Sequence, residues 1–117
     1  MSSTVLGVSF DARNALTVAT FWGEVLDRPI ADGATEDHAV LVTGDIPTSG
    51  PRVAFHRVPE GKVAKNRVHF DLLTDDIGSE TNRLLGLGAR KLSTITTGGY
   101  WVTFADPEGN EFDVIAR

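Results

Sequence analysis

The first quarter of the chain shows two different periods of apolar and polar positions. Within residues 5–12, apolar Val8 and Phe10 alternate with polar Ser9 and Asp11, which predicts a half-buried strand. Residues 15–26 instead carry apolar side chains every three or four positions, which predicts an amphipathic helix. Asn14 is a suitable N-cap for this helix, and Pro29 prevents the helix from continuing.

Residues 30–58 have no helical period. β-Branched residues cluster at 40–43 and 52–58, and the stretch between the clusters is rich in glycine, proline and polar residues. This pattern predicts a meander of about three short strands. The charged residues 59–65 predict an exposed connection to the second half of the chain.

The second half repeats the same order. Residues 67–74 alternate like a strand, Asp75 and Asp76 can open a helix with an apolar stripe, and Gly86 and Gly88 can end it. Turns of Gly-Gly and of Asp-Pro-Glu-Gly-Asn then separate three further strand-like segments, residues 91–95, 100–105 and 111–116.

The two halves form an internal repeat. Val8-Ser9-Phe10-Asp11 in the first predicted strand is echoed by Val68-His69-Phe70-Asp71 in the second half. We therefore expect one domain, residues 1–117, made of two βαβββ modules at about 4–58 and 66–116. The predicted fold class is α+β, with a curved, mostly antiparallel sheet that presents a concave face and with the helices outside.

Composition narrows the function classes. The formal net charge is −5, and the 11 Lys and Arg residues are scattered, which argues against nucleic-acid binding. The chain has no cysteine, which excludes disulfides, thiolate metal sites and a cysteine nucleophile. It also lacks a signal-peptide pattern and any apolar run long enough to span a membrane, so we expect a cytoplasmic location and no membrane partner.

The arrangement of motifs resembles the vicinal-oxygen-chelate (VOC) superfamily, which includes glyoxalase I, extradiol dioxygenases and bleomycin-resistance proteins. The resemblance covers essentially the whole chain. Within the superfamily, the chain is most similar to small bacterial glyoxalase-like domain proteins. The motifs that carry it are Phe21-Trp22-Gly23-Glu24-Val25-Leu26, Lys65-Asn66-Arg67-Val68-His69-Phe70-Asp71-Leu72, Leu87-Gly88-Ala89-Arg90 and Asp106-Pro107-Glu108-Gly109-Asn110-Glu111-Phe112.

The resemblance implies four positions that bind a divalent metal in the metal-dependent members. The first falls at Gly7 or Ser9, the second at about Phe55, the third at His69 and the fourth at Asp113. Only His69 and Asp113 are ligand types, fewer than the three protein ligands of a usual catalytic metal site. We therefore expect no cofactor and no complete metal site.

The two other histidines do not change this expectation. His38 falls in a predicted loop. His56 is one residue out of phase with Phe55 and is predicted to face away from the cavity.

Strand alternation predicts an acidic group around His69. Asp71 shares the face of His69, and Glu111 shares the face of Asp113, while Asp11 joins them from the first strand. One interpretation is acid/base chemistry at His69, held by Asp71 or Asp113. The alternative is that nearby Arg and Lys residues pair with these carboxylates structurally.

Aromatic residues complete the predicted ligand site. Tyr100 and Trp101 follow a Gly-Gly turn on a predicted strand, so one of them faces the cavity, and the sequence does not decide which. Phe55 is predicted to line the same cavity.

Two functional hypotheses follow. The first is a binding protein that holds a small organic molecule in the concave sheet without a complete metal site. The alternative is a lyase or isomerase of the glyoxalase-like type that uses His69, Asp71 and Asp113, with or without metal assistance. We also expect a homodimer, because sheet edges must be paired or covered. The edge strands and the first helix near Trp22 are the expected contact surfaces.

Overall fold

The computed structural model describes residues 2–43 and 50–117, so most of the glycine- and proline-rich stretch between the β-branched clusters at 40–43 and 52–58 lies outside the described residues. The chain divides into two units, Met1–Gly61 and Lys62–Arg117, and the boundary lies within the charged connection at 59–65.

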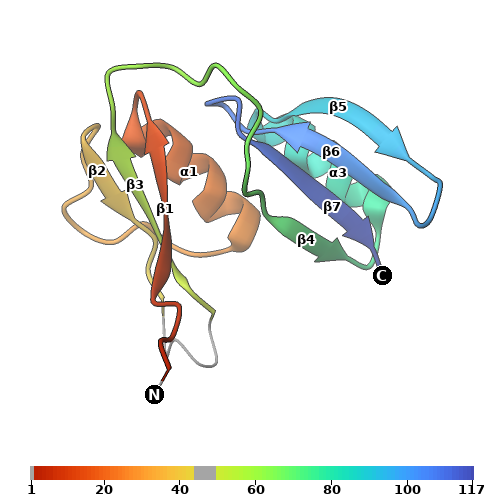
Figure 1. Ribbon diagram of the computed structural model, residues 1–117, viewed down its shortest axis with the longest axis horizontal. Helices are drawn as coiled ribbons and strands as arrows, with labels where there is room; N and C mark the ends of the chain where they lie inside the picture. The colour runs from red at the N-terminus through yellow and green to blue at the C-terminus, as the bar shows by residue number, and fades with distance from the viewer. Residues whose placement is uncertain (1, 44–49) are drawn as a thin grey trace. The chain divides into compact units, whose positions relative to one another are not determined.

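The described residues of the first unit form a three-stranded mixed sheet and one helix. Its elements are β1 (Gly7–Ala12), α1 (Ala15–Leu26), β2 (His38–Val40) and β3 (Arg52–Arg57). The strand order is β1-β3-β2, with β3 parallel to β1 and antiparallel to β2, and α1 packs on one face of the sheet (Figure 1). After α1, the described residues contain two strands and an isolated bridge between Ile30 and Leu41, where three strands were expected.

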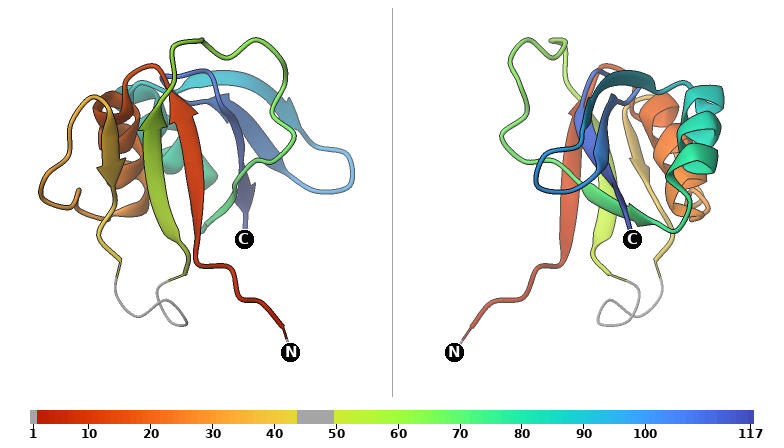
Figure 2. Two further views of the ribbon diagram at one scale, coloured as in Figure 1. Left: turned by 60° about the vertical axis from the view of Figure 1, so that its left-hand side comes forward. Right: turned by 90° about the vertical axis from the view of Figure 1, so that its right-hand side faces the viewer.

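The second unit has the order strand, helix and three strands. Its elements are β4 (Asp71–Thr74), α3 (Ile77–Leu87), β5 (Arg90–Ile95), β6 (Trp101–Ala105) and β7 (Glu111–Ala116). The strand order is β4-β7-β6-β5, with β4 parallel to β7, and α3 lies on one side of the sheet (Figure 2). The predicted α+β class is therefore confirmed, with seven strands in two mixed sheets in the described part of the chain.

Both helices begin at the residues that the sequence indicated. The Asn14 side chain accepts a hydrogen bond from the Thr17 amide at 3.0 Å, and the Asp76 side chain accepts one from the Ser79 amide at 3.0 Å. Helix α3 ends at Gly88, whose φ of 110° is in the left-handed region that favours glycine. Neither described helix is long and apolar enough to cross a membrane.

Aromatic side chains fill the space between α1 and the first sheet. The Phe10 ring lies 5.7 Å from Trp22 on the helix and 5.3 Å from Phe55 on β3, measured between ring centroids. Phe55 is 0% exposed, so the prediction that it lines a ligand cavity is wrong. Because neighbouring residues of a strand point to opposite faces, His56 faces away from the helix, the reverse of the expected orientation.

The core of the second unit lies under β6 and β7. The rings of Phe104 and Phe112 stack with centroids 5.6 Å apart, and both residues are fully buried together with Val102 and Val114. Phe70, which alternation also places on this side, is only half-buried because β4 begins after it, at Asp71.

Candidate functional site

His69, Asp71 and Asp113 lie together on the face of the second sheet opposite its core. The parallel pairing of β4 with β7 places Asp71 directly opposite Asp113. His69 Nδ1 is 3.0 Å from Asp71 Oδ1 and 3.9 Å from Asp113 Oδ2. The structure thus brings together the three residues that the sequence put forward as catalytic, and the Asp71 carboxylate is within hydrogen-bond distance of Nδ1.

A polar row extends from this group across the sheet. The Thr103 hydroxyl donates a hydrogen bond to Asp113 Oδ1 at 2.5 Å. Strand register places Thr103 opposite Asp113 and Ser93 opposite Thr103, so the row reads Asp71, Asp113, Thr103, Ser93. Sequence reasoning missed Thr103, because finding it requires the pairing of β6 with β7.

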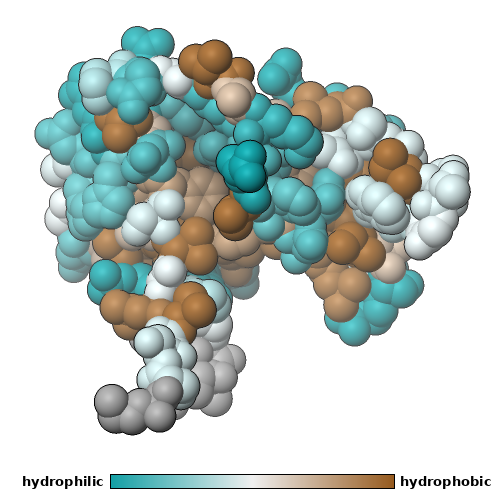
Figure 3. Space-filling view, in the orientation of Figure 1, coloured by the Kyte–Doolittle hydropathy of each residue, from teal (hydrophilic) through white to brown (hydrophobic). Residues whose placement is uncertain are grey.

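An apolar row lies beside the polar row, two residues away along each strand. Its members, in register across the sheet, are Leu73, Ile115, Trp101 and Ile95. None of them is fully buried, and Leu73 is 56% exposed. In Figure 3, apolar side chains gather beside polar ones over the second unit.

The register also resolves the alternative between Tyr100 and Trp101. Trp101 shares the open face with Thr103, because Val102 between them points into the core. Tyr100 precedes β6 and is 44% exposed, and its carbonyl accepts a hydrogen bond from the Ala116 amide at 3.2 Å. Trp101 is therefore the aromatic residue of the open face.

Glu111 is on the predicted face, but its carboxylate already has structural partners. Lys62 Nζ lies 3.0 Å from Oε2 and 3.1 Å from Oε1, and the Asn66 amide donates to Oε2 at 3.1 Å. Burial raises the pKa of the Glu111 carboxyl, but the hydrogen bonds from Lys62 and Asn66 and the charge of Lys62 outweigh burial and hold that pKa below its usual value. Glu111 therefore fits the alternative from the sequence, in which basic residues pair with the carboxylates structurally.

We expect Lys62→Met to lower the free energy of unfolding by about 1 kcal/mol at neutral pH, because it removes a partly buried charged hydrogen bond. A carboxyl whose folded-state pKa is lowered stabilises the fold above its unfolded pKa and loses this contribution as the pH falls through the folded value. The difference between variant and wild type should therefore shrink below about pH 4. Urea unfolding of both proteins at several pH values measures this difference in the free energy of unfolding. Lys65→Met is the control, and an equal effect there would refute the Lys62–Glu111 assignment.

Asp11 belongs to the first unit and is exposed on the face of β1 away from the helix. Its register partner on β3 is His56. This pair corresponds in the repeat to Asp71 and Asp113, which are register partners on β4 and β7. His56, rather than Phe55, therefore occupies the repeat position of Asp113.

The group on the second sheet has a donor set that suits a divalent cation. One ligand atom each from His69, Asp71 and Asp113 lies within 4.8 Å of the other two. Sequence analysis counted only two ligands, because Asp71 is not among the four positions implied by the family resemblance. One imidazole nitrogen and two carboxylate oxygens would be enough for a catalytic site that keeps open positions for water or substrate.

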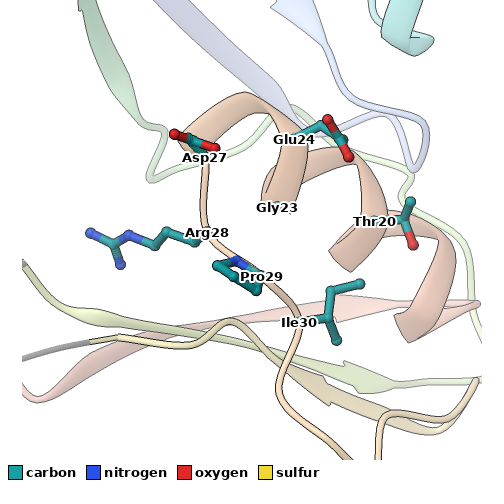
Figure 4. Close-up of a pocket in the computed structure, with 7 residues that line it drawn as sticks. All are labelled: Thr20, Gly23, Glu24, Asp27, Arg28, Pro29 and Ile30. Atoms are coloured by element: carbon teal, nitrogen blue, oxygen red, sulfur yellow. The ribbon is translucent and has the colours of Figure 1, made fainter.

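A separate pocket of about 350 Å³ lies at the end of α1 in the first unit (Figure 4). It is lined by Thr20, Gly23, Glu24, Asp27, Arg28, Pro29 and Ile30. The Arg28 guanidinium donates a hydrogen bond to the Pro51 carbonyl at 3.1 Å, which gives it a structural contact. None of the residues predicted for the site lines this pocket.

Comparison with known proteins matches residues 7–115 to the family model described as glyoxalase-like domain. No curated protein matches this chain. Among solved structures, one similar fold is a mutant of the fosfomycin resistance protein FosX from Listeria monocytogenes, complexed with Mn(II) and 1S,2S-dihydroxypropylphosphonic acid. Its TM-score is 0.78 at 12% sequence identity, and the match covers 99% of this chain and 91% of the FosX chain.

Two further structures show the same fold. The bleomycin-binding protein from Streptomyces verticillus, complexed with copper(II)-bleomycin, has a TM-score of 0.62 at 19% identity, with 99% of both chains covered. A glyoxalase/bleomycin resistance protein/dioxygenase family enzyme from Burkholderia phytofirmans has a TM-score of 0.75 at 14% identity, with 96% of this chain and 97% of that chain covered. At these identities the likeness establishes the fold alone.

Proposed function

Because this chain belongs to the glyoxalase-like domain family, whose fold hosts unrelated chemistries, we propose its function from the residues of its own second sheet. The protein binds a small organic molecule on the open face of that sheet. The observation that carries the proposal is the polar row that contains Asp71 and Asp113, next to the apolar row that contains Trp101.

The two rows favour an amphipathic ligand. Trp101 and Ile115 offer apolar contact to the body of the molecule, while Asp71 and Asp113 favour a group that donates hydrogen bonds or carries positive charge. The structural neighbours complexed with a dihydroxypropylphosphonic acid and with bleomycin support the proposal that this fold is used to bind organic molecules.

A fragment screen by NMR tests the proposal. We expect hits to shift the Trp101 indole N–H and the amides of β4, β6 and β7. Trp101→Ala should weaken these hits by about tenfold, corresponding to the roughly 1 to 2 kcal/mol of an aromatic contact. The matched control Tyr100→Ala removes an exposed aromatic ring outside the row and should leave binding unchanged. Hits confined to the pocket at the end of α1 would contradict the proposal.

A second candidate function is proton transfer in a lyase or isomerase. The observation that favours it is the 3.0 Å contact of Asp71 with His69 Nδ1. A carboxylate at Nδ1 fixes the ring orientation and leaves Nε2 to take a proton from a carbon next to a carbonyl, or to return it. A divalent metal held by His69, Asp71 and Asp113 would supply Lewis-acid polarisation of that carbonyl.

We expect the purified protein to carry no stoichiometric divalent metal. Asp71 is 54% exposed and His69 36% exposed in their side chains, so a cation there would exchange readily with solvent. Asp113 is also held by Thr103. Elemental analysis of protein purified without chelators is the measurement. One metal ion per chain that disappears in Asp71→Asn would contradict this expectation and favour the second candidate.

We also propose that the chain forms a homodimer. In the described chain, β1 and β2 are the edges of the first sheet, and β4 and β5 are the edges of the second. Val5 and Leu6, just before the β1 edge, are 67% and 57% exposed, so an apolar surface adjoins an unpaired edge. Trp22 does not contribute, because it is buried. Sedimentation equilibrium should give a dimer, and a strict 12.6 kDa monomer at high micromolar concentration would refute it.

A further inference from the structure

Two histidines face each other on the first sheet. His38 on β2 and His56 on β3 are register partners in an antiparallel pair. Their ring centroids are 4.9 Å apart with an angle of 47° between the ring planes. Both residues are exposed, so water and dissolved ions reach them.

The backbone pairing explains why the two rings are so close. The Arg57 amide donates to the Asp37 carbonyl at 2.9 Å, and the Leu41 amide donates to the Val53 carbonyl at 3.0 Å. Hydrogen-bonded and non-hydrogen-bonded pairs alternate along an antiparallel ladder, so His38 and His56 form a non-hydrogen-bonded pair. In such pairs the side chains are closest, with Cα atoms about 4.5 Å apart.

Both rings are on the open face of the sheet. Ala39 and Phe55, the register partners next along the two strands, are 1% and 0% exposed against the helix. Asp11 occupies the adjacent place in the same row, because β1 pairs it with His56 from the other side. The row across the sheet therefore reads imidazole, imidazole, carboxylate. In Figure 3, hydrophilic side chains cover much of the first unit.

We propose that His38 and His56 chelate a divalent transition-metal ion of the kind that imidazole prefers, namely Cu(II), Ni(II) or Zn(II). Metal–nitrogen bonds of about 2.0–2.1 Å require the two ligating nitrogens to approach within about 4 Å of each other. Rings with centroids 4.9 Å apart meet this requirement after small side-chain rotations. The Asp11 carboxylate flanks the pair and lowers the electrostatic cost of placing a cation there.

The His38–His56 site differs from the group of His69, Asp71 and Asp113 in its ligand types and in the number of coordination positions left to solvent. Two imidazoles on a flat, exposed surface leave most coordination positions to water or to a second molecule. The ion would therefore be exchangeable, and the site would take up metal from solution rather than retain it through purification. Asp11 places one negative charge beside the pair, compared with the two carboxylates beside His69.

Titration of the full-length chain with Cu(II), followed by electron paramagnetic resonance, tests the proposal. In His69→Ala protein, which removes the imidazole of the second sheet, we expect one bound Cu(II) with hyperfine coupling to two imidazole nitrogens. His38→Ala and His56→Ala, each made in the His69→Ala protein, should abolish that signature. Each should weaken binding by at least about tenfold, since loss of even a second-shell partner commonly costs that much.

The double variant of His38 and His56, also made in His69→Ala protein, separates chelation from independent binding. If the two rings share one ion, the double variant should lose more affinity than either single variant but less than the sum of the two single losses, because each single variant already breaks the chelate. All variants should keep the far-ultraviolet circular dichroism of the wild type, since both side chains are exposed. Unchanged Cu(II) affinity in either single variant, or losses that add in the double variant, would overturn the proposal.

Discussion

Phe104→Ala is expected to lower the free energy of unfolding by about 3–5 kcal/mol, the range measured for removal of a fully buried phenylalanine ring. Phe104 is 0% exposed, and its ring stacks on Phe112 with a centroid distance of 5.6 Å. Truncation therefore removes apolar burial and leaves a cavity against a ring that cannot fill it. A domain of this size is stable by only about 5–15 kcal/mol, so the loss is a large share of the total.

Urea unfolding measures this loss, and Leu85→Ala provides the comparison. Leu85 lies on α3 with 44% exposure, and alanine is a better helix former, so its change should stay within about 0.5 kcal/mol. Phe70→Ala should fall between the two, because Phe70 is half-buried. Similar losses in Phe70→Ala and Phe104→Ala would mean that the core extends to residues before β4.

Features set by local sequence were predictable. The caps at Asn14 and Asp76 depend on hydrogen bonds to amides three residues away, so the sequence contains both partners. The shared face of Asp71 and His69 follows from strand alternation, which is also local. The repeat of strand, helix and strands could be read from periods of apolar residues for the same reason.

Features set by register were not predictable. The position of Phe55 was assigned by counting along a family pattern, and an error of one residue reverses the face of a strand residue. Only the parallel pairing of β1 with β3, which aligns Asp11 with His56, identifies His56 as the open-face residue. Likewise, the partner of Glu111 is Lys62, 49 residues away, and no local pattern indicates that contact.

His69→Gln is expected to reduce the affinity for fragments that shift the Trp101 indole by up to about tenfold, because one hydrogen bond contributes roughly 0.5–1.5 kcal/mol net. The imidazole lies beside Asp71 on the open face, with Nδ1 3.0 Å from Asp71 Oδ1. Glutamine keeps a polar side chain but has neither the ring nor its titratable nitrogens. Its effect on unfolding should be small, since the His69 side chain is 36% exposed.

Two comparisons distinguish a binding role of His69 from a structural one. Asp71→Asn keeps the shape of its side chain but removes the negative charge that favours donor or cationic groups and that contacts His69, so it should weaken the same fragments as well. His56→Gln changes a histidine of the first sheet and should leave them unaffected. Isothermal titration of each variant gives the fragment affinity, and urea unfolding gives the free energy of unfolding. If His69→Gln lowered stability as much as Phe104→Ala while fragment affinity stayed intact, His69 would be a structural residue and the ligand face would lie elsewhere.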